Sequence, residues 1–106
     1  MVAFDEFKKL DLRVAQVKSV SEHPNADKLF ILQVDVGGQS KQIVAGLRNH
    51  YRKEDLIGRK VVVVNNLEPV TLRGKVSDGM ILAAVAGEVP VILVPEKDVP
   101  CGSLVR

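Results

Sequence analysis

Several means by which small proteins are stabilised or equipped for chemistry are absent from this sequence. Its 106 residues contain one cysteine, no tryptophan, and aromatic residues at only 4% of positions. A single cysteine forms neither an intrachain disulfide nor a thiolate metal cluster, which favours a cytoplasmic protein. The chain has no apolar run near the roughly 20 residues of a membrane helix, and its charged N-terminus lacks the apolar segment of a signal peptide. We therefore expect a single domain over residues 1–106 with an aliphatic core.

Residues that could perform catalysis or bind a metal are also sparse. His23 and His50 are the only histidines, and neither belongs to a cluster of ligands at metal-binding spacing. The chain has no nucleophile–base arrangement, no glycine-rich phosphate loop and no pair of carboxylates in an apolar run. His23 stands directly before Pro24 and is predicted to be a turn residue rather than a base or a ligand. The sequence predicts a protein that is not an enzyme and uses no cofactor or metal.

Positive charge is concentrated in the middle third of the chain. The whole sequence carries a net charge of +2, but residues 39–75 contain eight basic and three acidic residues, a net charge of +5. The segments before and after it carry −1 and −2. This distribution makes the middle segment a candidate for the face that meets a polyanion. The alternative is an ordinary solvated surface with long cationic side chains.

Short β-prone runs separated by polar turns make up most of the sequence. Strands are predicted over residues 12–20, 29–36, 41–47, 61–67 and 79–85. A helical segment is predicted over residues 4–12, one or two helical turns between residues 48 and 58, and a proline-interrupted extension over residues 89–106. Five short strands with a small helix between the third and fourth predict an all-β protein, a Greek-key OB-fold barrel. An SH3-like barrel or another small β domain is the alternative.

Two polar segments stand where an OB-fold carries its nucleic-acid-binding loops. Residues 21–28 (SEHPNADK) join the first and second strands, and residues 68–79 (EPVTLRGKVSDG) join the fourth and fifth. In an OB-fold these connections flank the binding face on strands two and three, so we expect them to lie side by side. The second is predicted to be a long loop with a flexible basic tip, Arg73-Gly74-Lys75, that contacts phosphate or is simply a solvated turn.

Other polar residues near these loops allow both a binding and a structural interpretation. Asn65 and Asn66 follow a strand, where an amide can contact a base edge or satisfy turn backbone groups. Ser77 belongs to a stretch that either caps the next strand or, with Met80, meets RNA. A general single-strand binder would need stacking aromatics. Phe30 and Tyr51 are the candidates for that role, and the position of Phe30 predicts a core residue.

Six short segments form a recognisable pattern: residues 11–14 (DLRV), 23–29 (HPNADKL), 36–37 (VG), 43–47 (IVAGL), 66–69 (NLEP) and 73–80 (RGKVSDGM). In order and spacing they resemble the tRNA-binding domain found at the C-terminus of bacterial methionyl-tRNA synthetase, in the EMAPII-like cytokine, and as stand-alone proteins. The likeness covers roughly residues 7–106. A chaperone-like branch of the same fold departs from the HPNADKL pattern, so this chain is more similar to the tRNA-binding branch.

The resemblance implies a non-catalytic OB-fold that recognises tRNA by shape, as a stand-alone protein or as the β-subunit of methionyl-tRNA synthetase. By analogy, the following residues are expected to bind tRNA: Lys28, Arg48, Asn49, Lys53, Asn66, Arg73, Lys75, Ser77 and Met80. It also implies a homodimer formed by residues 1–10 and 89–106, with Phe4, Phe7, Leu10, Val91 and Leu93 at the interface. A chaperone-like, protein-binding dimer of the same fold is the alternative function.

Overall fold

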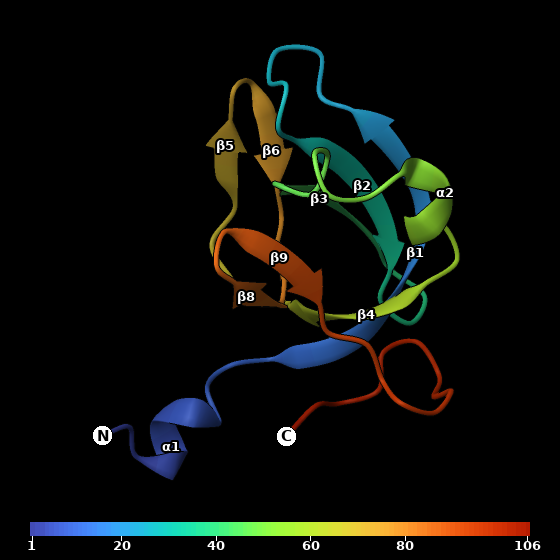
Figure 1. Ribbon diagram of the computed structural model, residues 1–106. Coiled ribbons are helices and arrows are strands. Elements are labelled where there is room, and N and C mark those ends of the chain that lie inside the picture. The colour runs from blue at the N-terminus through green and yellow to red at the C-terminus, as the bar shows by residue number, and fades with distance from the viewer.

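The computed structural model describes residues 1–106 and is built around one strongly curved antiparallel sheet (Figure 1). The two helices are α1 (Phe4–Phe7) and α2 (Lys53–Leu56). The strands are β1 (Leu12–Glu22), β2 (Phe30–Asp35), β3 (Ser40–Ala45), β4 (Lys60–Val64), β5 (Val70–Leu72), β6 (Lys75–Ser77), β7 (Met80–Ile81), β8 (Ala83–Ala86) and β9 (Val89–Ile92). The predicted all-β class, and the helix between the third and fourth strands, are confirmed.

The main sheet has the strand order β3-β2-β1-β4-β7, with the long β1 in the middle. The pairing of β1 with β2 shifts register between Val17 and Ser19, and such shifts bend a strand around a small barrel. Strand β6 then approaches β3, where the N–H of Asp78 donates to the carbonyl of Gln42 at 2.8 Å. The sheet is therefore a nearly closed five-stranded barrel, and the OB-fold is confirmed.

The interior of the barrel is aliphatic. Side chains that alternate along the strands, such as Leu32 and Val34 on β2 and Val61 and Val63 on β4, are 0% exposed. β-branched residues suit this position because they pack well on a pleated surface. Phe30 is 3% exposed and belongs to the same cluster, so the prediction that it is a core residue is confirmed.

The predicted long loop over residues 68–79 is wrong, because most of it forms the hairpin β5–β6. Val70 pairs with Ser77 and Leu72 with Lys75, which leaves Arg73 and Gly74 as a two-residue turn. Both turn residues have positive φ, 53° and 88°, as a type I′ turn requires. The basic tip is therefore a fixed turn at the end of a short ribbon rather than a flexible loop.

The segment predicted as a fifth strand is divided in two. Met80–Ile81 pairs with β4, and after Leu82 the chain leaves this sheet to form the separate hairpin β8–β9. Pro90 is tolerated in β9 because the strand pairs on one side only. The last residues return to β1 within the same chain, where the N–H of Val14 donates to the carbonyl of Ser103 at 2.9 Å.

The N-terminal helix is shorter than predicted. It spans Phe4–Phe7 rather than residues 4–12, and none of its residues is buried. A single turn of helix gains little from its own hydrogen bonds and needs packing to be stable. The segment after the helix is attached by Asn66, whose amide donates to the carbonyl of Lys9 at 2.7 Å and accepts from the N–H of Asp11 at 2.9 Å, and by Asn65, whose N–H donates to the carbonyl of Asp11 at 2.7 Å.

Gly79 connects the hairpin to β7 and gives a direct test of barrel closure. Its φ is +132°, and a Cβ there would lie 3.0 Å from the carbonyl oxygen of Val64. We expect Gly79→Ala to lower the free energy of unfolding by about 1–3 kcal/mol, measured by urea denaturation. Gly46→Ala is the matched control, because Gly46 has open space around it and no positive φ. Equal stability of the two variants would contradict this account of the closure.

Candidate nucleic-acid interface

The two polar connections singled out in the sequence lie against each other at one end of the barrel (Figure 1). His23, in the β1–β2 loop, is 2% exposed. Its Nδ1 accepts a hydrogen bond from the N–H of Asn25 at 3.0 Å, and its Nε2 lies 2.9 Å from the carbonyl oxygen of Leu72 at the tip of β5. The prediction that the two segments lie side by side is confirmed. His23 is the residue that joins them, a role beyond the turn residue predicted from sequence.

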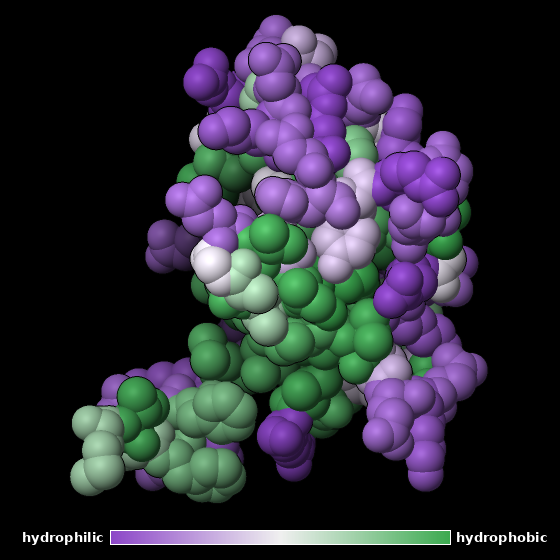
Figure 2. All heavy atoms as spheres, viewed as in Figure 1, coloured by the Kyte–Doolittle hydropathy of each residue, from purple (hydrophilic) through white to green (hydrophobic).

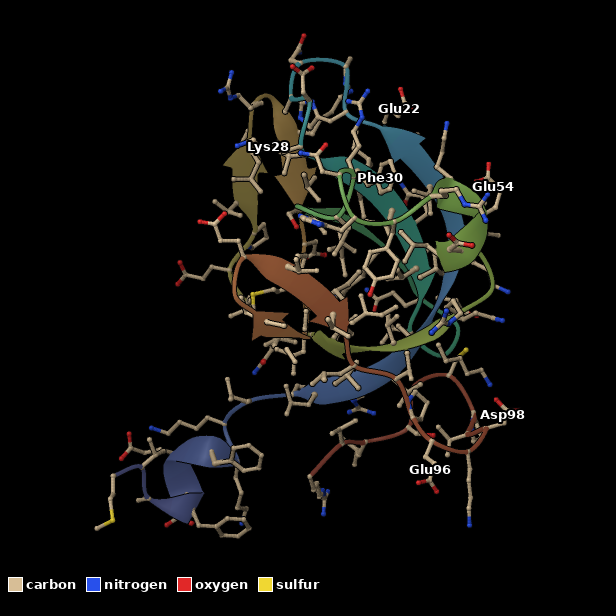
Figure 3. All side chains as sticks on the ribbon, in the orientation of Figure 1. Glu22, Lys28, Phe30, Glu54, Glu96 and Asp98 are labelled. Carbon is tan, nitrogen blue, oxygen red and sulfur yellow. The ribbon has the colours of Figure 1, made fainter.

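Three cations without a carboxylate partner gather around this contact, on the β1–β2 loop and the β5–β6 turn. No carboxylate lies within 4.0 Å of Lys28, Arg73 or Lys75. Lys28 and Arg73 are exposed, and Lys75 is half-buried. Figure 3 shows Lys28 at the same end of the barrel as Glu22, with Glu96 and Asp98 at the opposite end. We call this end, formed by residues 22–28, 48–53 and 72–75, the basic rim.

Arg48, Asn49 and Lys53 line a shallow depression of about 340 Å³ next to the β1–β2 loop. Glu22 lies between the two cations: its carboxylate is 3.0 Å from Arg48 Nη2 and 3.7 Å from Lys53 Nζ. Arg48 Nη1 also donates to the carbonyl of His23 at 3.4 Å. Arg48 therefore holds the loop in place, and an incoming phosphate would compete with Glu22 for both cations.

Further basic residues of the middle segment are neutralised by neighbours. Lys41 Nζ donates to the carbonyl of Asn65 at 2.6 Å and lies 3.8 Å from Asp78. Arg52 pairs with Asp55 at 3.2 Å, and its hydrogen bond holds the pKa of Asp55 below the usual range. The hydrogen bond from Lys60 to Asp98 similarly lowers the pKa of Asp98. The net charge of the segment thus overstates its free positive charge, which is left to the basic rim and to Arg59, an exposed residue near Asp98 with no carboxylate within 4.0 Å.

Three of the nine predicted tRNA-binding residues lie at the base of the β5–β6 hairpin, away from its tip. Ser77 is 2% exposed, and its hydroxyl accepts from the N–H of Val44 at 2.9 Å and donates to the carbonyl of Gly79 at 3.0 Å. Asn66 satisfies backbone groups near α1, and Met80 pairs with Val64. Ser77 and Asn66 thus make the backbone contacts that a structural role predicts. The six remaining predicted residues lie at the basic rim: Lys28, Arg48, Asn49, Lys53, Arg73 and Lys75.

Sequence reasoning missed two residues of this site, His23 as a bridge and Glu22 as a partner of the cations. The His23–Leu72 contact joins positions 49 residues apart, and no local pattern signals it. Glu22 lies in the segment predicted as the 21–28 loop, whereas the structure makes it the last residue of β1. Its negative charge in a loop expected to meet RNA was the available sign that it would pair with cations.

A second surface is apolar. Figure 2 shows hydrophilic atoms over the upper end of the molecule and an apolar area over the β8–β9 hairpin. Val85, Val89, Val91 and Leu93 are 42–70% exposed there. Phe4, Phe7 and Leu10 are also exposed and line a depression of about 400 Å³ with the C-terminal residues 104–106. These positions include all five residues expected at a dimer interface.

No helix combines the length and the apolar character needed to cross a membrane. No group of three or more histidine, cysteine, aspartate or glutamate side chains is placed to hold a metal ion.

Comparisons with known proteins agree with this geometry. A family model described as "Putative tRNA binding domain" matches residues 12–104. Methionine–tRNA ligase of Pyrococcus furiosus is 50% identical over 105 residues, which are 99% of this chain and 14% of the ligase. The chain thus spans about one seventh of the ligase's length.

Solved structures share the whole fold. A MetRS-related protein from Pyrococcus horikoshii superposes with a TM-score of 0.93 and 31% identity, over 100% of this chain and 98% of the other. The chaperone CsaA from Bacillus anthracis superposes with a TM-score of 0.90 and 32% identity, over 100% of this chain and 99% of the CsaA chain. Because the family model matches residues 12–104 and the superposition covers the whole barrel, the chain belongs to the tRNA-binding domain family.

Proposed function

We propose that this chain is a non-catalytic module that binds folded tRNA at the basic rim and works in trans with methionyl-tRNA synthetase, as a β-subunit or tRNA-binding cofactor. Lys28, Arg73 and Lys75 supply unpaired cations, and Arg48, Asn49 and Lys53 extend them along the α2 side. The observation that carries the proposal is the contact of the β1–β2 loop with the β5–β6 hairpin, which groups these cations. The proposed setting is the cytoplasm, where tRNA is charged.

Shape recognition fits the composition of the rim better than stacking does. Neither aromatic residue considered as a stacking platform is fully exposed: Phe30 is buried, and Tyr51 is half-buried, packs against the core, and accepts a hydrogen bond from the N–H of Ile92 at 3.2 Å through its hydroxyl. Proteins that hold single strands without sequence preference rely on exposed aromatic faces. Cations on a fixed turn and a fixed loop instead suit the phosphates of a folded RNA, whose positions are set by its helices.

The salt dependence of tRNA binding tests this proposal. Engagement of about three to five phosphates predicts that log K falls with a slope of roughly −2 to −4 per log unit of salt. Fluorescence anisotropy with labelled tRNA between about 50 and 300 mM salt measures the slope. The same RNA cut into unstructured fragments is the control, and we expect it to bind at least about tenfold more weakly. A flat salt response, or equal affinity for the fragments, would contradict the proposal.

The second candidate function is protein binding by a chaperone-like dimer. It is favoured by the exposed apolar residues of the β8–β9 hairpin and by the similarity to a CsaA chaperone. In this case an unfolded client protein binds the apolar surface, which is separate from the basic rim. A competition experiment tests whether the two ligands use separate surfaces: if they do, added tRNA leaves client binding unchanged. A chain that binds the client protein but not tRNA supports the second function.

A further inference from the structure

His23 is the one buried titratable side chain at the basic rim, and its ring uses both nitrogens in the protein's own structure. The backbone N–H of Asn25 can only donate, so Nδ1 is the acceptor and carries no proton. In a neutral ring the proton is then on Nε2, which donates to the carbonyl of Leu72 at 2.9 Å. One bond thus shapes the β1–β2 loop, and the other crosses to the β5–β6 hairpin.

The crossing bond ends one residue before the basic turn. Leu72 precedes Arg73 and pairs with Lys75, so the backbone group held by His23 is directly adjacent to the two unpaired cations. The hairpin has three residues in each strand, and an isolated ribbon of that size is marginal in water. Strand β6 is attached to β3 by Ser77 and by Gln42, whose Nε2 donates to the carbonyl of Val76 at 2.9 Å, whereas β5 is attached near the tip by His23.

The same residue is tied to the other cations of the rim through its backbone. Its carbonyl accepts from Arg48 Nη1 at 3.4 Å, and Arg48 also contacts Ala26 and Glu22. Because this contact uses the backbone carbonyl, a substitution of the His23 side chain leaves Arg48 in place and acts on the hairpin alone. Burial at 2% exposure protects the two ring hydrogen bonds from exchange with water.

We infer that His23 is a positioning residue of the RNA site, a latch that fixes Arg73 and Lys75 relative to the β1–β2 loop before RNA arrives. This inference rests on the proposed function. RNA that meets pre-placed cations does not have to order the hairpin tip, so the latch raises affinity without touching RNA. Its loss would leave the barrel and the Arg48 contact in place and would release only the hairpin tip, which carries Arg73 and Lys75.

Two conservative substitutions divide the roles of the ring. In His23→Asn the amide oxygen can take the place of Nδ1 and keep the Asn25 bond, whereas the crossing bond is lost. In His23→Gln the amide nitrogen can take the place of Nε2 and keep the crossing bond, whereas the Asn25 bond is lost. Because each variant loses one buried hydrogen bond, we expect similar losses of thermal stability.

We expect His23→Asn to weaken tRNA binding about tenfold and His23→Gln to retain most of the wild-type affinity. Equal affinities for the two variants would overturn the inference, because a merely structural role does not distinguish the two nitrogens. In the RNA-free protein, amide exchange at Arg73 and Gly74 should quicken in His23→Asn alone. This second measurement needs no tRNA. If the wild-type chain fails to bind tRNA, the proposed function is refuted, but the amide exchange rates still show whether His23 fixes the hairpin tip.

The wild-type ring gives a third measurement that needs no variant. ¹⁵N spectra of His23 at neutral pH should show a protonated Nε2 and an unprotonated Nδ1. The opposite tautomer would overturn the inference, because Nε2 could not then donate to Leu72. This result is decisive even if a substitution at this buried position prevents folding.

Discussion

Replacing Arg73 and Lys75 together by alanine is expected to lower the affinity for tRNA by about 100-fold at roughly 0.1 M salt. Each side chain is assigned one phosphate contact, and a hydrogen bond to a charged group contributes about 1.5 kcal/mol or more. Two such losses correspond to about two factors of ten in the dissociation constant. The slope of log K against log salt should also become shallower by about one to two units.

The effect of lowering the net charge must be separated from the effect of removing the two cations at the turn. Lys18→Ala with Lys97→Ala removes the same two charges from exposed residues outside the basic rim. This control should change affinity by less than about threefold, since exposed charges beyond a Debye length of about 10 Å are screened. Equal weakening by both double variants would mean that the rim is not the site. The structural cost of removing Arg73 is expected to be small, because it is an exposed turn residue with no ion pair.

Substituting aspartate for both Val91 and Leu93 is expected to convert a homodimer into a monomer. Val91, on β9, and Leu93, directly after that strand, are 45% and 42% exposed, so the change leaves the core of the single chain intact. In the homodimer that the family resemblance implies, we propose that the partner covers them, and a buried carboxylate without a partner costs about 3–5 kcal/mol. The dimer dissociation constant should therefore rise by more than about 100-fold.

Sedimentation velocity at about 1–50 μM measures this conversion, and Ile57→Asp is the matched control. Ile57 is 49% exposed but follows α2, outside the apolar area formed by β8, β9 and α1. The control is expected to stay dimeric. A wild-type chain that sediments as a monomer over this range would refute the dimer proposal, and a dimer that tolerates both aspartates would move the interface elsewhere.

Much of the fold could be predicted because its signals are local. Four consecutive valines, residues 61–64, favour a strand that is buried in the barrel, and the polar segments between β-prone runs mark the turns. The β5–β6 hairpin escaped prediction because its strands are three residues long and Arg73-Gly74 lacks the Asn or Asp that usually signals a type I′ turn. Short strands of this kind depend on packing against β3, which a sequence window does not contain.

The site was predictable as a set of cations but not as an arrangement. Charge counting located the basic segment, and yet Lys41, Arg52 and Lys60 are occupied by Asp78, Asp55 and Asp98. These pairings join distant parts of the chain or depend on local rotamers, so composition does not reveal them. The bridge from His23 to Leu72 is the clearest case, since it requires two loops to meet at the rim of a closed barrel.

Mapping the tRNA contact on the protein tests the central claim most directly. In ¹H–¹⁵N spectra of the wild-type chain, stepwise addition of tRNA should shift or broaden amides of residues 23–28, 48–53 and 72–75, and leave those of residues 96–98 and of β8 and β9 unchanged. Changes centred on the Glu96–Asp98 end or on the apolar hairpin, with the basic rim unaffected, would contradict the account.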